Sequence, residues 1–373
     1  MKKIAYVGID YHLKSLTIAV LIEGESEFHN IIKIPNTDKI ISKHMNKLSK
    51  EFNIKACYEA SFSGYSFHRK MTSWGYHCDV IAPSLIPRKK GDRRKNDNRD
   101  ARNLAKSYSV GDLAIVHVPT EDEESVRHLI RCRLSFKDFE KRTKNQINSL
   151  LHTQSIYWPN KKWNSRHLTW LSKLQMSQKH LQTILEEQLG LLSYIQSRVE
   201  SLDKQIEEIA KSEIYAPSVI KLRAFKGIGT LIAMILIAEI TDFRRFPNAR
   251  ALMAFLGLIP SENSSSERHR TGSITKTGNS RVRKHLVEAV QHCTRAPKIS
   301  PQMKKNLSQV DAHSANIAVE CMNRLHKRYW HLALRGKLRS VALTATAREF
   351  VGFIWAMMQP EPVQYDLNVK EQF

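Results

Sequence analysis

The sequence lacks any apolar run of the roughly 20 residues that a bilayer-spanning helix requires. Its longest candidate, Phe350 to Met358, is too short. The chain opens Met1-Lys2-Lys3-Ile4 and passes directly into a strand pattern, which predicts that no signal peptide is present. These absences argue against a membrane protein, and we expect a cytoplasmic one.

Cysteine is scarce, and no two cysteines form a Cys-x-x-Cys pair. The five are Cys57, Cys78, Cys132, Cys293 and Cys321. This scatter argues against zinc ribbons and disulfide frameworks, and it fits a reducing cytosol. Gly-rich phosphate loops are also missing, which leaves little support for a sugar-kinase-like interpretation of Gly8-Ile9-Asp10.

Acidic residues are few relative to basic ones. The chain has 36 Asp and Glu against 59 Lys and Arg, which gives a formal net charge of +23 and a pI near 9.8. A field of this sign attracts nucleic acid or an anionic membrane surface, and the missing apolar run favours nucleic acid. At 373 residues, the chain is long enough for two or three domains.

The first third of the chain alternates strand and helix patterns. The strand patterns cover residues 3–10, 15–21, 28–34, 54–59 and 77–81. The helical patterns cover residues 37–52, 65–74 and a segment that begins near Asp97. The order β-β-β-α-β-α-β-α predicts an α/β domain, whereas the remainder of the chain is helical.

The predicted α/β domain has carboxylates at the strand ends, where functional sites of such domains form. Asp10 ends the first strand, Glu59 ends the fourth, and Asp97 and Asp100 lie three residues apart on one helix face. Each acid alone fits an ordinary turn or helix start. The set, however, is typical of a ribonuclease-H-like nuclease core. Hard oxygen ligands of this kind suit Mg²⁺ or Mn²⁺, and two such ions can clamp the attacking and leaving oxygens of a phosphodiester.

A dense basic run comes directly before the acid pair, and it favours a polyanionic substrate. Its members are Arg88, Lys89, Lys90, Arg93, Arg94 and Lys95.

Two long helices are expected in the middle of the chain, over residues 122–152 and 177–212. The second carries apolar residues from Leu181 to Ile209 at alternating steps of three and four once Gln188 is counted, which predicts a coiled coil within the chain or between subunits. Tryptophans 158, 163 and 170 lie between the helices. They could stack on bases, but ordinary packing is favoured.

The C-terminal part opens on Lys226-Gly227-Ile228-Gly229 between two apolar helical patterns. This resembles a helix-hairpin-helix turn, in which glycines let the backbone approach a phosphate and the next helix offers N–H groups. An ordinary tight turn is the alternative. Further helices are expected over residues 280–294, 314–334 and 342–358.

A serine-rich stretch runs from Gly257 to Asn279. Ser264 and Ser265 could attack a phosphodiester while Arg268, Arg270 and Lys276 neutralise the developing charge. The alternative is a flexible polar loop, which the composition alone favours.

Together these segments resemble the DEDD transposases of bacterial insertion sequences, relatives of the Piv and MooV invertases that include bridge-RNA-guided serine recombinases. The resemblance rests on Gly8-Ile9-Asp10, Glu59-Ala60, Asp97-x-x-Asp100-Ala101, Gly227-x-Gly229, Gly257-Leu258-Ile259-Pro260 and Ile274-Thr275-Lys276-x-Gly278-Asn279. It covers nearly the whole chain in order.

This resemblance implies a RuvC-like DEDD domain (1–116), a coiled-coil region (117–215), a helical transposase domain (216–358) and a tail (359–373). Asp10, Glu59, Asp97 and Asp100 match the metal-binding acids. Ser265 matches the catalytic serine, with Ser264 as the alternative because Ser266 stands where a glycine is usual.

The expected partners are DNA at the element ends and the target, a non-coding guide RNA, and further copies in a dimer or tetramer. The expected reaction passes through a phosphoserine link to DNA, in a nucleoid-associated protein of the bacterial cytoplasm.

Two other functions remain open. A metal-dependent nuclease of the junction-resolvase kind would use the acids alone, and its serine stretch would be structural. A non-catalytic nucleic-acid-binding protein would need only the basic surface.

Overall fold

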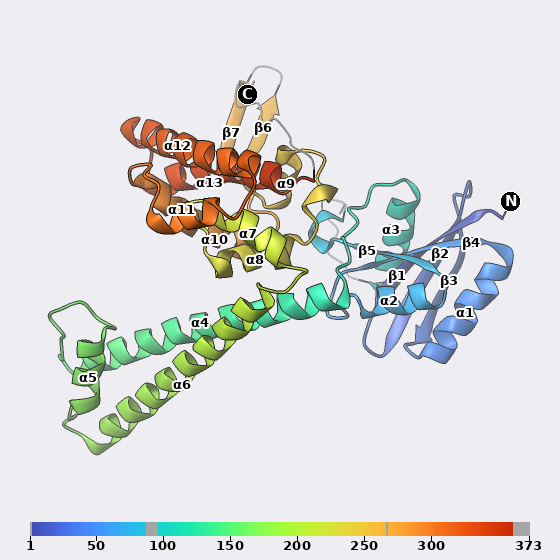
Figure 1. Cartoon of the computed structure of the whole chain (residues 1–373). Coiled ribbons are helices and arrows are strands. Elements are labelled where there is room, and N and C mark those ends of the chain that lie inside the picture. The colour runs from blue at the N-terminus through green and yellow to red at the C-terminus, as the bar shows by residue number, and fades with distance from the viewer. Residues whose placement is uncertain (1, 87–95, 266–267, 361–373) are drawn as a thin grey trace. The chain divides into compact units, whose positions relative to one another are not determined.

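The N-terminal strand patterns form one five-stranded sheet in the computed structural model, which describes residues 2–86, 96–265 and 268–360 (Figure 1). The strands are β1 (Ile4–Tyr11), β2 (Ser15–Ile22), β3 (Phe28–Pro35), β4 (Asn53–Glu59) and β5 (His77–Ile81). Their order is β3-β2-β1-β4-β5. The first three strands are antiparallel, and β4 and β5 run parallel to β1. This mixed sheet confirms the α/β prediction and is consistent with a ribonuclease-H-like domain.

Helices cover both faces of the sheet. On one face, α1 (Asp38–Glu51) and α2 (Ser66–Ser73) pack against a core that includes Val7 and Ile9. The other face carries α3 (Asp97–Ser109), whose alanines 101 and 105 are fully buried. Period-2 alternation places Gly8 and Asp10 on the α3 face.

Gly8 sets how closely α3 approaches the sheet. A Cβ at Gly8 would lie 2.3 Å from the Ala101 backbone oxygen and 2.4 Å from the Ala105 nitrogen. These are backbone atoms, which cannot rotate away. Gly8 therefore lets α3 pack directly on β1 beside Asp10.

We expect Gly8→Ala to lower the free energy of unfolding by about 3 kcal/mol, the upper end for overpacking. The readout is thermal unfolding followed by circular dichroism. Gly190→Ala is the control, because a Cβ at Gly190 meets no atom within 4 Å. Equal unfolding temperatures for the two variants would contradict this account of Gly8.

The chain divides into two compact units, Met1–Pro119 and Thr120–Phe373. The further division of the second unit at residue 216 stays a prediction. Among the described residues, no helix is both long and apolar enough to span a bilayer.

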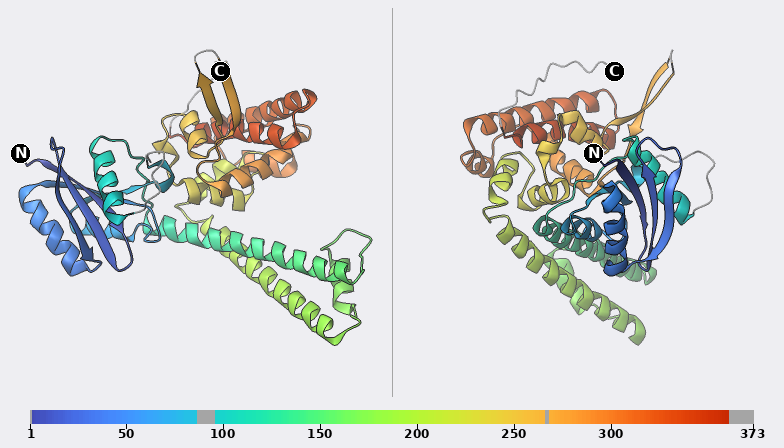
Figure 2. Two further views of the ribbon diagram at one scale, coloured as in Figure 1. Left: turned by 180° about the vertical axis from the view of Figure 1, so that it is seen from behind. Right: turned by 90° about the vertical axis from the view of Figure 1, so that its right-hand side faces the viewer.

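The second unit begins with a pair of long helices, α4 (Glu121–Thr153) and α6 (Lys179–Ile209), which pack along each other (Figure 2). A capping box starts α4, with Thr120 and Glu123 each accepting from the other's backbone. The buried side chains of α6 include most of the predicted apolar repeat. Arg133 on α4 holds Asp203 on α6 through two hydrogen bonds of 2.7 and 3.0 Å. Both long helices were predicted, whereas α5 (Ser165–Lys173) between them was not.

The remaining helices surround α8 (Thr230–Ile240) and α13 (Arg339–Met357), which are largely buried. They are α7 (Ala216–Arg223), α9 (Ala249–Phe255), α10 (Ser280–Val290), α11 (Pro301–Leu307) and α12 (Ala312–Leu334). Two short 3₁₀ turns, Phe243–Arg245 and Gln291–Thr294, also lie in the described part of this unit, and another, Pro83–Leu85, lies in the first unit. The helices predicted over residues 280–294, 314–334 and 342–358 are confirmed. The first of these ranges consists of α10 followed by a 3₁₀ turn. Helix α11 was not predicted.

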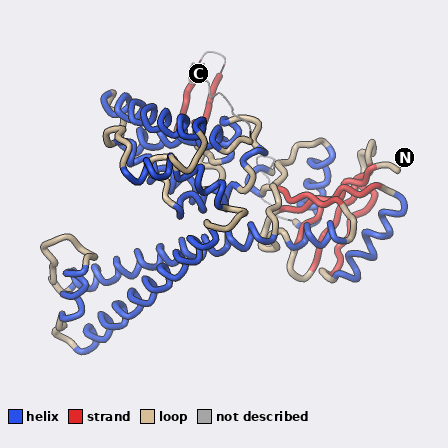
Figure 3. The backbone as a smooth tube through the Cα atoms, viewed as in Figure 1, coloured by secondary structure: helices blue, strands red, loops and turns tan. Residues whose placement is uncertain are grey.

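The serine-rich stretch is a β-hairpin and not the flexible loop that its composition favoured. Strands β6 (Pro260–Ser265) and β7 (Arg268–Ile274) pair antiparallel, and Figure 3 shows them as two adjacent strands. The loop expectation was wrong because serine and asparagine have low strand propensity, and cross-strand pairing overrides that preference here. We call residues 260–274 the serine hairpin.

Candidate active site

The first site lies at the ends of β1 and β4. These strands are parallel neighbours, and Ile9 pairs with Tyr58. Asp10 and Glu59 are the next residues on each strand, so both project from the same sheet face. That face also carries Gly8 and is the one that α3 covers.

Helix α3 brings the other two acids to this face. Its N-cap is Asn96, whose side chain accepts from the Asn98 backbone N–H at 3.0 Å. Asp97 and Asp100 stand one turn before the buried Ala101 and Leu104, on the stripe that faces the sheet. Burial of this stripe therefore places both carboxylates beside the strand ends.

The Asp10 carboxyl is influenced by the charges of Asp97 and Asp100. Burial raises the pKa of Asp10 above its ordinary value, and the charges of Asp97 and Asp100 raise it further, while His12 opposes them. Three carboxylates in one partly buried place carry an unfavourable repulsion, which a cation would relieve.

His12 and Lys33 supply nearby positive charge and were not predicted from the sequence. The His12 Nε2 atom lies 3.1 Å from Asp10 Oδ2 and 3.6 Å from Asp97 Oδ1. Lys33 Nζ donates to Asp97 Oδ2 at 2.9 Å, and this hydrogen bond lowers the pKa of Asp97. His12 and Lys33 thus both lie beside the Asp97 carboxylate.

Strand pairing explains how Lys33 reaches the site. Asp10 pairs with Thr17, and Thr17 pairs with Lys33, so the three residues form one row across β1, β2 and β3. Thr17 is fully buried, and its hydroxyl oxygen has no hydrogen-bond partner in the described chain.

The spacing Asp10-x-His12 could have pointed to His12 in the sequence. Lys33 carried no comparable local signal, because only the sheet register brings it close.

The donor set fits a divalent cation. Asp10, His12 and Asp97 each offer one ligand atom, and these atoms lie within 4.8 Å of one another. Glu59 and Asp100 are half-buried, and their side-chain carboxylates make no hydrogen bond or ion pair with another described residue, so these oxygens remain open to a ligand. A carboxylate-rich set of this kind favours hard cations.

The second site is the serine hairpin. Ser265 pairs with Arg268 and Ser264 pairs with His269, so both serines stand at the distal end of the paired strands. Ser266 lies outside the described residues, as do the side chains of residues 262–271. The structure therefore shows where the backbone of the predicted nucleophile lies.

The base of the serine hairpin is tightly braced. A Cβ at Gly257 would lie 1.8 Å from the Thr277 oxygen, and one at Gly278 would lie 2.0 Å from the Phe255 oxygen. Both glycines also have positive φ, +65° and +80°. Arg283 Nη1 donates to the Leu256 and Thr277 oxygens, each at 2.9 Å, and so joins the two arms.

An ion pair with a buried glutamate connects this base to the long helix α4. Arg131 on α4 donates to both oxygens of Glu239 on α8, at 2.8 and 2.7 Å. Asn279 donates to Glu239 at 2.6 Å, while its own side-chain oxygen caps α10. Burial of Glu239 opposes its ionisation, but these hydrogen bonds prevail and hold its pKa below the ordinary value.

We expect Glu239→Ala to destabilise the second unit by about 3 kcal/mol, because it leaves the partly buried Arg131 and Asn279 donors without their buried acceptor. Urea unfolding measures this loss. Arg244→Ala removes an ion pair whose arginine is exposed and should leave the urea midpoint unchanged. Similar midpoints for the two variants would show that the Glu239 network does not brace the hairpin.

The structure shows the surroundings of some of the predicted nucleic-acid contacts, all of which stay predictions. The basic run from Arg88 to Lys95 lies outside the described residues. The Lys226 ammonium donates to the Ala296 oxygen at 2.8 Å. A Cβ at Gly227 would lie 2.4 Å from the Ala289 oxygen, so packing against α10 already accounts for this glycine. Gly229 is the N-cap of α8 and has open space around its Cα.

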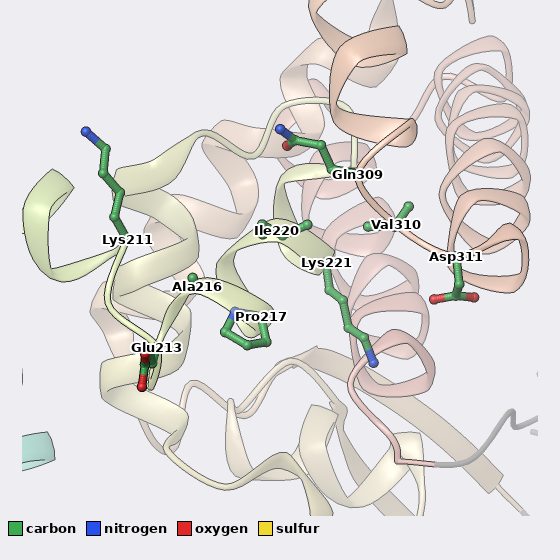
Figure 4. A pocket seen from close by; sticks show the side chains of 9 residues that line it. All are labelled: Lys211, Glu213, Ala216, Pro217, Ile220, Lys221, Gln309, Val310 and Asp311. Carbon is green, nitrogen blue, oxygen red and sulfur yellow. The ribbon is translucent and has the colours of Figure 1, made fainter.

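A pocket of about 600 Å³ lies between α7 and the segment before α12 (Figure 4). Its floor is apolar and its rim carries both signs of charge. The lining residues are Lys211, Glu213, Ala216, Pro217, Ile220, Lys221, Gln309, Val310 and Asp311. None of the acids or serines described above lines it, so it is separate from both candidate sites.

Comparisons with known proteins match two parts of the chain to transposase family models. Residues 7–156 match a transposase family model of the DEDD, IS110 type, and residues 220–307 match the model for transposases of the IS116/IS110/IS902 family. The putative transposase y4qE of Sinorhizobium fredii is 36% identical over 356 residues, which span 95% of this chain and 88% of that protein.

Two further relatives carry transposase names. The transposase for insertion sequence element IS1533 of Leptospira borgpetersenii is 34% identical over 68% of this chain and 75% of its own length. A probable family 20 transposase of Pseudomonas aeruginosa is 24% identical over 74% of this chain and 83% of its own length.

Proposed function

Because the chain belongs to the IS116/IS110/IS902 family of insertion-sequence transposases, and is thus an enzyme that cuts and transfers DNA, we propose that the acid cluster on the β1–β4 edge is its metal-dependent catalytic site. The observation that carries the proposal is the convergence of Asp10, His12 and Asp97 within 4.8 Å, at the strand end that Glu59 shares.

Asp10, Glu59, Asp97 and Asp100 hold Mg²⁺ or Mn²⁺ in this proposal, with His12 as an additional ligand. When bound, the cation supplies charge neutralisation at the phosphodiester undergoing cleavage. The chain's own contribution is positional. Gly8 lets α3 carry two of the acids onto the sheet, and Lys33 orients the Asp97 carboxylate.

We further propose that Ser265 is the nucleophile, with Ser264 as its alternative. The Ser265 Oγ forms a bond to phosphorus, one ester P–O bond breaks, and the serine proton ends on the departing hydroxyl of the released strand. A hydroxyl of the incoming strand then attacks the phosphoserine and returns the proton to Ser265. The braced base supports this role, because a nucleophile needs a fixed position. Arg268, Arg270 and Lys276 would neutralise the developing charge.

The remaining contacts follow from charge and family resemblance. The basic run at residues 88–95, together with Lys226 and the helix-hairpin-helix-like turn at Gly227 and Gly229, would bind the DNA backbone. The proposal also includes a non-coding guide RNA as partner, a coiled coil formed by α4 and α6, assembly into a homo-oligomer, and association with the nucleoid.

A second candidate is hydrolysis by the acid site alone. It is favoured by the donor set of the acid cluster, which is complete without a serine. In that case the serine hairpin would serve only to position DNA.

The test of the proposed site is strand cleavage of labelled element-end DNA with and without divalent metal. The protein is purified with RNA expressed from its flanking DNA and assayed in Mg²⁺, in Mn²⁺ and in excess chelator. We expect strand breaks in both metals and none in chelator. Equal cleavage in chelator would refute a metal-dependent site.

A further inference from the structure

The long helices α4 and α6 have an uneven charge distribution. Residues 141–185, which include α5 and the helix ends that adjoin it, contain eight Lys and Arg and no Asp or Glu. We call residues 141–185 the helical tip. Within the second unit, the helical tip lies at the end of the helix pair remote from α8 (Figures 1 and 2).

The rest of the helix pair has the opposite sign. Residues 120–140 carry six acids against four Lys and Arg, and residues 186–213 carry seven acids against three. A generally basic composition would not produce this reversal along one pair of helices. The positive charge is therefore concentrated on the helical tip.

The helical tip has its own scaffold. Ile147, Leu171 and Leu185 belong to a small separate core. His167 is fully buried, accepts from the Trp163 backbone N–H at 3.0 Å, and lies against tryptophans 158, 163 and 170 at centroid distances of 5.0 to 5.6 Å. The tryptophans thus have the packing role that the sequence favoured, and they give the helical tip a fixed shape.

Most of the cations of the helical tip are not used by that scaffold. Lys144 pairs with Glu140 at 2.6 Å, and Lys162 donates to Asn148 at 3.1 Å. Lys141, Lys161, Arg166, Lys173 and Lys179 are exposed, and none makes an ion pair with any residue the structure describes. A rigid surface with five uncompensated cations suits a polyanion.

We propose that the helical tip is a separate contact surface for duplex DNA, which binds the phosphate backbone without reading its sequence. Duplex is favoured over single strand because single-strand binding relies on several exposed aromatic rings in succession. The three tryptophans pack against His167, which leaves Tyr157 as the one exposed aromatic residue of residues 141–185. DNA is favoured because the family acts on it. The proposal does not depend on which group is the nucleophile.

The test compares two triple variants that remove the same charge. Lys161→Gln/Arg166→Gln/Lys173→Gln neutralises the helical tip. Lys39→Gln/Lys43→Gln/Lys47→Gln neutralises three exposed cations on α1 and is the control. Binding of each to a fluorescent 40-base-pair DNA duplex is measured over a range of NaCl concentrations, after thermal melting has confirmed that each variant is folded.

Each cation that contacts a phosphate contributes about 0.9 to the slope of log K against log salt. We therefore expect the helical-tip variant to reduce the slope by about 2 to 3 and to bind about tenfold or more weakly at ~0.1 M salt, with little change in the control. Equal losses in the two variants would overturn the proposal, since net charge would then explain them.

Two other outcomes would also overturn it. Unchanged DNA binding with weakened binding of an RNA duplex of the same length would assign the surface to RNA. Unchanged DNA binding with a smaller sedimentation coefficient would instead indicate that the helical tip pairs with the acidic part of α6 in a second copy.

Discussion

Replacing Ser265 by alanine is expected to abolish the covalent protein–DNA adduct and to lower strand joining by at least about 10³-fold, because the variant lacks the oxygen that we propose bonds to phosphorus. The substitution removes one side-chain atom and keeps the backbone pairing of Ser265 with Arg268. The adduct is measured on a denaturing gel after incubation with labelled element-end DNA and Mg²⁺.

Two serines of the same strand provide the comparison. Ser264→Ala should retain the adduct, and so should Ser261→Ala, whose hydroxyl hydrogen-bonds to the Ser273 oxygen at the base of the hairpin. Loss of the adduct in Ser264→Ala alone would identify Ser264 as the nucleophile in place of Ser265. Full strand joining by a Ser264→Ala/Ser265→Ala double variant would refute the proposal that one of these two serines is the nucleophile.

The double variant Asp10→Asn/Asp97→Asn is expected to reduce DNA cleavage about 10³-fold or more while leaving the protein folded. Asparagine keeps the shape of aspartate but loses its charge, so the site no longer attracts a divalent cation. Burial and the neighbouring acids already oppose ionisation of Asp10, so the loss of its charge relieves repulsion. This gain offsets the loss of the solvent-accessible Lys33–Asp97 ion pair, and the unfolding temperature should change little. Cleavage is measured by gel and Mn²⁺ affinity by calorimetry.

Asp38→Asn is the matched control, because Asp38 is an exposed carboxylate that pairs with Lys70 at 2.6 Å and lies on α1. It should preserve both Mn²⁺ affinity and cleavage. If the Asp10/Asp97 variant bound Mn²⁺ as tightly as the control, the cation would have to be held elsewhere.

Much of the first unit could be predicted from the sequence because its strands are apolar and its helices amphipathic. The positions of Asp10 and Glu59 at strand ends followed from that pattern, and their shared face follows from the register. The Asp97 and Asp100 pair was visible from helical spacing alone. Local periodicity carried enough information in each of these cases.

Long-range contacts could not be predicted in the same way. Lys33 reaches Asp97 only through the pairing of β3 with β2. The serine hairpin escaped notice because its residues have low strand propensity. Gly227 was assigned to phosphate approach, although the Ala289 backbone already requires a glycine there. Composition indicates which secondary structure a segment prefers. It cannot show which backbone segment, far away in the sequence, will pack against a given residue.

The central claim, that DNA becomes linked to a serine of the hairpin, is tested most directly by mapping the adduct in the wild-type protein. Trypsin cleaves after Arg250 and Arg268, so Ser261, Ser264, Ser265 and Ser266 are released in one peptide. After nuclease trimming, fragmentation mass spectrometry locates the residual nucleotide phosphate. The account predicts that it lies on Ser265. Cleaved DNA formed in Mg²⁺ with no phosphate on any serine of this peptide would contradict the account and leave metal-directed hydrolysis.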